Sequence, residues 1–277
     1  MSEAFPELTL FLGPQTSLGR SINDIMRVSR GAFPDAGLRV YPNRISMPII
    51  GQCQDATRSV AERQEVIKAA AAGLPMLLSA TSFFGGGREM FSGLRLLPGA
   101  GDRFRSLQGV APQARIVLSV DPVHHLFLAQ QAGALDTRVV SAGWEQVFEL
   151  SWVEAVQDIR DVLPEAEILI LTANAARCSE TVMADLLGPG AGALPDLLGL
   201  FRPALDETGR AILARLEAEG PIDQKRQEEL LDSFKRELEY IVFKEKYGFD
   251  KVTDLLLKRK FSEDVAQIEK IPNVRVF

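Results

Sequence analysis

Cysteine and histidine are scarce in this chain, and their scarcity excludes the common disulfide and metal frameworks. The 277 residues contain two cysteines, Cys53 and Cys178, and two histidines, His124 and His125. Two cysteines so far apart in sequence form neither a disulfide framework nor the closely spaced pairs of a zinc site. We therefore expect no metal site, and we interpret both cysteines as small buried apolar residues.

Long apolar runs and an excess of positive charge are missing as well. No run approaches the roughly 20 apolar residues that a membrane helix needs, and residues 1–6 lack the basic and apolar regions of a secretory signal. The net charge of -6 argues against general affinity for nucleic acid or an anionic membrane. We expect a cytoplasmic protein with neither partner, in which binding of a small anionic ligand depends on local arginines.

The composition, with 46% hydrophobic and 25% charged residues, is typical of a globular protein with a sizeable core. Short apolar runs alternate with helical patterns along the first two thirds of the chain. The runs are Leu8 to Leu12, Leu38 to Tyr41, Met76 to Ser79, Ile116 to Val120 and Ile168 to Thr172. This alternation predicts an α/β fold, a doubly wound parallel sheet with helices between the strands.

Helix boundaries can be predicted from capping residues. The first helix should span about Leu18 to Arg30, where apolar residues recur at helical spacing. Ser59 with Glu62, and Ser151 with Glu154, each fit a capping box and mark two further helix starts.

Beyond Thr172 the pattern becomes mainly helical. A glycine-rich break at residues 187–192 precedes three candidate helices and an apolar end that could form a late strand. The helices are about Asp206 to Glu219, Ile222 to Lys246 and Lys251 to Lys260, and the strand lies within Ile271 to Phe277. We expect residues 1–187 to form the α/β core and residues 188–277 a helical C-terminal portion that packs on it.

Residues 13–21 follow the first predicted strand and form a turn rich in glycine and hydroxyl groups. The first turn of a helix has N–H groups without intrahelical partners and a partial positive charge, so it attracts anions. A phosphate loop adds glycines, a lysine and a hydroxyl in the pattern G-x-x-x-x-G-K-[ST]. The candidate ligand-binding residues here are Gly13, Thr16, Ser17, Gly19, Arg20 and Ser21.

This loop departs from the phosphate-loop pattern in two ways. Arg20 stands where the lysine belongs, and its planar guanidinium suits bidentate pairing whereas lysine acts as a compact point charge. Gly13 stands one residue earlier than the spacing requires. An ordinary strand-to-helix turn, with Ser17 or Ser21 near the helix cap, is therefore the alternative interpretation.

Two further features fall near the carboxyl ends of predicted strands, where open α/β folds bind ligands. Residues 85–88 read Gly-Gly-Gly-Arg, so Arg88 is a second candidate for contact with an anion; a surface loop is the alternative. His124 and His125 could supply a base, although adjacent helical residues point in different directions. A solvated or capped histidine is the alternative there.

The serial order of these segments resembles the bacterial sulfotransferase-like P-loop proteins. Members begin with a loop like L-H-I-G-x-H-K-T-x-T-T, and Phe11 to Ser21 is similar to it. Later segments of the family read L-L-S-D-E-N-F-L-G, L-Y-P-G-A and L-x-x-R-N-P. Their counterparts here are Leu77 to Gly85, Leu96 to Ala100 and Leu118 to Pro122, and the helix start at Ser151 and the segment Ile271 to Val274 also match.

The resemblance implies a P-loop NTPase or sulfotransferase-like fold and a specific donor. In the family, 3'-phosphoadenosine 5'-phosphosulfate donates a sulfuryl group to a hydroxyl or amine. This chain departs from the family at the residues that carry the chemistry. Thr16 replaces the loop lysine, Asp121 the arginine for the 3'-phosphate, Ala129 a hydroxyl and Thr81 an acidic residue that could serve as base.

Three functional hypotheses follow from these residues. The first is a sulfotransferase-like enzyme that holds the donor on residues 13–21, with Arg20 or Arg88 in place of the lysine. The second is a non-catalytic descendant that binds a polar small molecule or a protein partner, which the substitutions favour on mechanism. The third is a nucleotide-dependent kinase or NTPase that uses Arg20 and Ser21, although a clear second acidic motif for magnesium is missing.

Overall fold

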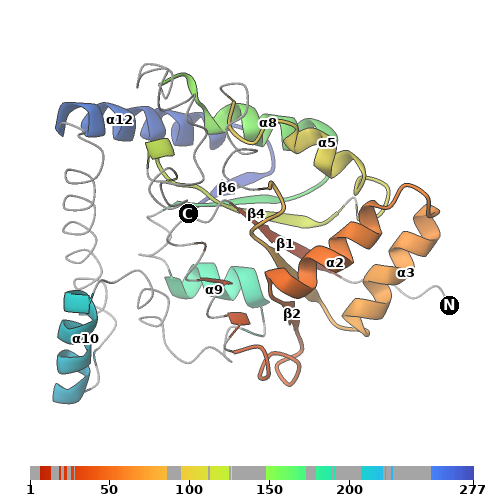
Figure 1. The fold of residues 1–277 in the computed structure, drawn as a ribbon, viewed down its shortest axis with the longest axis horizontal. Coiled ribbons are helices and arrows are strands. Elements are labelled where there is room, and N and C mark those ends of the chain that lie inside the picture. Colours follow the sequence, from red (N-terminus) through yellow and green to blue (C-terminus); the bar gives the residue numbers. More distant parts are fainter. Residues whose placement is uncertain are drawn as a thin grey trace.

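The computed structural model of the protein describes a sheet and helices packed on it. The described residues are 7–13, 19, 22–23, 26–27, 29–85, 95–111, 113–124, 126, 148–172, 179–188, 190, 207–220, 222, 226 and 251–277. Within them, six parallel strands form one sheet in the order β2-β3-β1-β4-β5-β6 (Figure 1). The strands are β1 (Leu8–Leu12), β2 (Arg39–Tyr41), β3 (Met76–Ala80), β4 (Arg115–Ser119), β5 (Ile168–Leu171) and β6 (Val274–Val276).

This sheet confirms the predicted α/β class, the parallel strand pairing and each predicted strand. The register places Leu10 of β1 beside Leu78 of β3 and Ile116 of β4, so three apolar strands form the centre of the sheet. The bounds of the five predicted runs differ from expectation by at most one residue at either end: β4, for example, ends at Ser119 rather than Val120. Apolar runs define a strand's centre, whereas its ends depend on hydrogen bonding.

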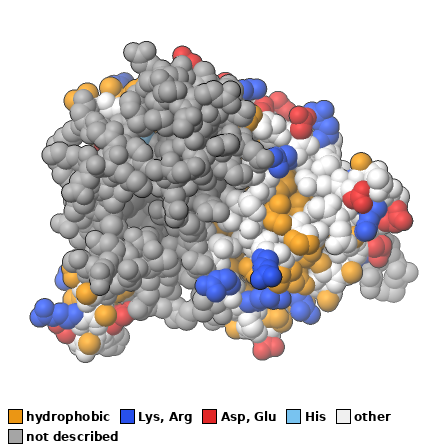
Figure 2. Space-filling model, in the orientation of Figure 1, with side chains coloured by type: hydrophobic (Ala, Val, Ile, Leu, Met, Phe, Trp, Pro, Cys, Tyr) orange, Lys and Arg blue, Asp and Glu red, His pale blue; other side chains and the backbone are white. Residues whose placement is uncertain are grey.

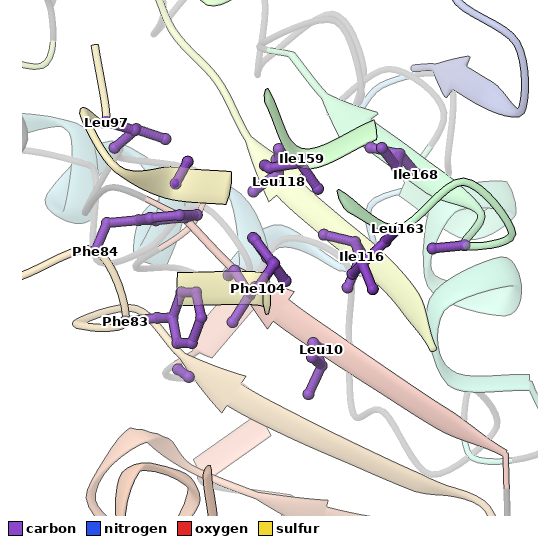
Figure 3. Close-up of a cluster of buried hydrophobic side chains, with 14 of the residues drawn as sticks. Leu10, Phe83, Phe84, Leu97, Phe104, Ile116, Leu118, Ile159, Leu163 and Ile168 are labelled. Carbon is purple, nitrogen blue, oxygen red and sulfur yellow. The ribbon is translucent and has the colours of Figure 1, made fainter. Parts of the chain in front are cut away.

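One face of the sheet carries the larger apolar core. The helices that pack there are α2 (Asn43–Gln54), α3 (Val60–Ala71), α5 (Ala100–Arg105), α8 (Trp152–Val162) and α12 (Lys251–Ile268). Figure 3 shows Leu10 and Ile116 of the strands in one cluster with Phe104 of α5 and Ile159 of α8. Alternate residues of each strand point to this face, because successive side chains of a strand lie on opposite sides.

The other face is buried as well, which is why the strands read as continuous apolar runs. Its cluster contains Phe11, Leu77, Val117 and Leu169 from the central strands, with Ile22, Met26 and residues of α9 (Ser179–Leu187). Residues 19, 22–23 and 26–27 are helical, in agreement with the predicted first helix. Helices therefore cover both faces of the sheet.

The two predicted capping boxes have different outcomes. Ser59 is confirmed: its hydroxyl accepts from the Glu62 amide at 3.2 Å, while the Glu62 carboxylate accepts from the Ser59 amide at 2.8 Å. Ser151 caps α8 by accepting from the Val153 amide, but the box with Glu154 is wrong. Glu154 instead lies 3.2 Å from the guanidinium of Arg95, an opposite charge that competes for its carboxylate.

The C-terminal portion contributes helices and one strand. α10 (Glu207–Glu219) agrees with its prediction, and the helix predicted for residues 222–246 lies largely outside the described residues. α12 continues to Ile268, beyond the predicted end at Lys260, because Asp264 and Ile268 extend its buried face. β6 then pairs with β5 in the same sheet as the first strands.

Ser59→Ala should lower the free energy of unfolding by about 1 kcal/mol at pH 7, since one helix-terminal N–H group loses its acceptor. The hydrogen bonds from Ser59 hold the pKa of Glu62 below its ordinary value of 4.5. The stability that these hydrogen bonds give to the ionised Glu62 is fully present above pH 4.5 and is lost as the pH falls through the lowered pKa of Glu62. The difference in free energy of unfolding between the parent protein and Ser59→Ala should therefore become smaller in acid. Urea unfolding of the parent protein and the variant at pH 7 and pH 3 measures the destabilisation and its dependence on pH. An equal difference in free energy of unfolding at the two pH values would contradict the capping box between Ser59 and Glu62.

Cys53 is buried in α2, as expected, while Cys178 lies outside the described residues. Burial raises the pKa of the Cys53 thiol to about 11, despite the nearby charges of Arg63 and Arg58. In a Cys178→Ser background, we expect an aromatic disulfide reagent at pH 8 to label Cys53 only after denaturation, because the thiolate is the reactive form. Rapid labelling of the folded protein would contradict this burial.

Candidate functional site

The strand order creates a topological switch point between β1 and β4. From β1 the chain runs to β2, on the far side of β3, whereas from β4 it runs to β5 on the opposite side. The chain therefore continues from these two adjacent strands to strands that lie on opposite sides of the pair. Ligands of open α/β sheets bind in the crevice that such a divergence leaves.

Gly13 lies at the mouth of this switch point, directly after β1. It is buried, and a Cβ atom there would lie 3.1 Å from the backbone nitrogen of Ser119, at the end of β4. Glycine at this position is therefore explained first by the close approach of two backbones. The same approach keeps the start of the candidate loop against the end of β4.

The remaining predicted ligand residues are described unequally. Gly19 is buried in the helical residues that follow β1. The others, namely Thr16, Ser17, Arg20, Ser21 and Arg88, lie outside the described residues, so their roles stay predictions.

Two asparagines hold the carboxyl end of β3. The hydroxyl of Ser79 donates to the Oδ1 atom of Asn23 at 2.7 Å, which ties β3 to the helical residues after β1. Asn43, at the start of α2, accepts at Oδ1 from the amide and hydroxyl of Ser82, at 3.2 and 3.0 Å. Sequence reasoning missed both asparagines, although the position of Asn43, two residues after the end of β2, is a usable signal.

A cation that the sequence analysis did not select lies beside the segment after β3. Arg103 of α5 donates from Nη1 to the carbonyl oxygen of Phe83 at 2.8 Å. Phe83, Phe84 and Phe104 form an aromatic cluster next to it, with the Phe83 and Phe104 ring centroids 5.1 Å apart. Thr81, where the resemblance expects an acid, is 8% exposed.

The segment after β4 is buried and held by side chains from two helices. The indole N–H of Trp152, in α8, donates to the carbonyl oxygen of Asp121 at 2.9 Å. The Nε2 atom of His124 lies 3.1 Å from Oδ1 of Asp254, in α12, and the His124 side chain is fully buried. Lys258 approaches the other oxygen of Asp254 at 3.1 Å. His124 thus belongs to a buried contact between elements, and His125 lies outside the described residues.

Asp264 anchors the start of α8 from the same helix, α12. Its Oδ2 atom accepts from the backbone amide of Trp152 at 2.9 Å, and Lys260 lies 3.4 Å from its Oδ1 atom. A buried carboxylate with an amide donor and a cation meets the requirements for burial of a charge. Trp152 is consequently fixed at both its backbone and its indole.

The charges described at this edge are unfavourable for the donor chemistry that the resemblance implies. Asp121 is an acidic residue, 8% exposed, at the position where the resemblance expects an arginine for the 3'-phosphate. Figure 2 shows Lys and Arg side chains beside an apolar strip in the region of α2 and β2, with acidic groups elsewhere on the described surface. On the described surface seen in Figure 2, positive charge is therefore concentrated in the region of α2 and β2.

Among the described residues, no group of three or more His, Cys, Asp or Glu side chains could hold a metal ion. No described helix combines the length and the apolar composition needed to cross a membrane. Comparison with family models, with curated protein sequences and with solved structures finds no match to this chain.

Gly13→Ala should destabilise the protein by about 1 to 3 kcal/mol, because the new methyl group meets a backbone atom inside the sheet, which cannot move as a side chain can. Gly51→Ala is the matched control: it lies in α2 with nothing within 4 Å of the added Cβ. That change should stabilise by about 0.5 to 1 kcal/mol. Denaturant unfolding compares them, and equal effects would contradict the close approach at Gly13.

Proposed function

We propose that the protein binds a small phosphorylated or sulfated molecule at the carboxyl edge of its sheet, between the ends of β1 and β4. The observation that supports this proposal is the strand order, which gives β1 and β4 diverging connections with Gly13 between them. Backbone N–H groups of a strand-to-helix turn suit an anion, since they need no lysine to donate hydrogen bonds. The resemblance makes 3'-phosphoadenosine 5'-phosphosulfate, or the bisphosphate that remains after transfer, the first candidate ligand.

Binding without sulfuryl transfer is the form of this proposal that the described residues favour. Transfer needs positive groups or N–H donors around the moving group and a base for the acceptor. Thr81 has no group that could act as that base, and the acidic side chain of Asp121 does not suit contact with a 3'-phosphate. An active sulfotransferase-like enzyme is the second candidate, and it requires Arg20 or Arg88 to replace the missing lysine.

Isothermal calorimetry with 3'-phosphoadenosine 5'-phosphate tests the proposal directly. We expect heat of binding at micromolar to millimolar ligand; no heat at millimolar concentration would overturn it. Titration with ATP and magnesium is the parallel test of a kinase or NTPase, which predicts binding that depends on magnesium.

Arg20→Ala should weaken binding of 3'-phosphoadenosine 5'-phosphate by about tenfold, the effect of losing one charge-assisted hydrogen bond of roughly 1.5 kcal/mol. Arg259→Ala is the control, because Arg259 lies on α12, where it is 78% exposed and pairs with Glu263. Calorimetry under identical salt compares the two variants. Equal losses of affinity would contradict a specific role for Arg20.

A further inference from the structure

We propose that α12 acts as a clamp on the segment that follows β4, residues 120–124, and that Asp254 is a positioning residue for the ligand site through its contact with His124. This inference rests on the proposed function, because the positioned segment borders the switch point. It assigns the C-terminal portion a role in ligand binding.

The first observation is the contact between His124 and Asp254. These residues are 130 positions apart in sequence, and their Nε2 and Oδ1 atoms lie 3.1 Å apart. In the tautomer with its proton on Nε2, His124 donates a hydrogen bond to this carboxylate oxygen. The histidine side chain is fully buried while the Asp254 side chain is 23% exposed. A partly exposed residue of α12 therefore holds a buried residue of the segment after β4.

The second observation is that α12 reaches the same segment again through α8. Asp264 accepts from the Trp152 amide, and the Trp152 indole donates to the Asp121 carbonyl oxygen, both at 2.9 Å. Residues 254, 257, 261, 264 and 268 recur at spacings of three and four, which places them on one face of the helix. Leu257, Asp264 and Ile268 on that face are at most 4% exposed.

The third observation links this clamp to the switch point. Ser119, which ends β4, is the residue whose backbone nitrogen lies 3.1 Å from a Cβ built on Gly13. Val120 is held next to it by its amide, which donates to Leu171 of β5 at 2.8 Å. The segment fixed by α12 is therefore continuous with the wall against which the candidate loop begins.

Two charged groups are described near this contact. Lys258 lies on the same helix at 3.1 Å from Asp254, and Asp121 lies three residues before His124 on the clamped segment. Removal of the Asp254 carboxylate deprives His124 of this hydrogen-bond partner. Residues 120–124 should then depart more often from the conformation that binds the ligand. A binding-competent state that is populated less lowers the apparent affinity in proportion.

The experiment compares Asp254→Ala with Glu263→Ala, which breaks an ion pair on the exposed side of the same helix. Hydrogen exchange of the ligand-free protein, read on the amides of residues 120, 121, 123 and 124, reports the clamp. Calorimetry with 3'-phosphoadenosine 5'-phosphate reports the coupling to ligand. We expect Asp254→Ala alone to speed exchange at these amides and to raise the dissociation constant roughly threefold or more.

If Asp254 has only a structural role, Asp254→Ala should lower the melting temperature but leave the affinity for the ligand unchanged. Its dissociation constant, measured well below the melting temperature, would then equal that of Glu263→Ala. That result, or unchanged exchange at residues 120–124, would overturn the inference. Asp254→Asn keeps an oxygen acceptor for His124 and should restore parent-like exchange, and it serves if the alanine variant does not fold. Absence of ligand binding to the parent protein would contradict the proposed function. The hydrogen-exchange rates of residues 120–124 would then still test whether α12 holds this segment.

Discussion

The burial of β1 on both of its faces is the constraint on which the rest of this structure depends. Leu10 points into one apolar cluster and Phe11 into the other, so both faces of the sheet must be covered by packed elements at this strand. β3 and β4 flank β1, while β2 lies beyond β3 and β5 beyond β4, so the connections from β1 and β4 run to opposite sides. The candidate site at Gly13 thus depends on the strand order as much as on loop composition.

Much of the fold could be predicted from the sequence because its signals are local. Each strand core is a short apolar run, and the Ser59 capping box involves residues only three apart. The Glu154 box failed because Arg95, 59 residues away, competes for the carboxylate. The end of α12 was placed too early, since the lysine-rich stretch ending at Lys260 resembles a helix end while the buried residue Ile268 lies beyond it.

The candidate site could be predicted less well, because its contacts join distant residues. Nothing near His124 in sequence indicates that its partner is Asp254, and the asparagines that hold β3 follow no recognised motif. Two departures from the family pattern, Thr81 and Asp121, are described at the edge of the sheet, and both are buried there. The resemblance to sulfotransferase-like proteins therefore supports a hypothesis for the place of a ligand better than a hypothesis of sulfuryl transfer.

The central claim is that one anionic ligand lies between the ends of β1 and β4. Amide chemical shifts followed by NMR during titration with 3'-phosphoadenosine 5'-phosphate test it most directly. The account predicts saturating shifts that centre on Gly13, Gly19 and the amides of residues 119, 120, 121, 123 and 124. Shifts confined to the opposite edge of the sheet, or to exposed arginines alone, would contradict it.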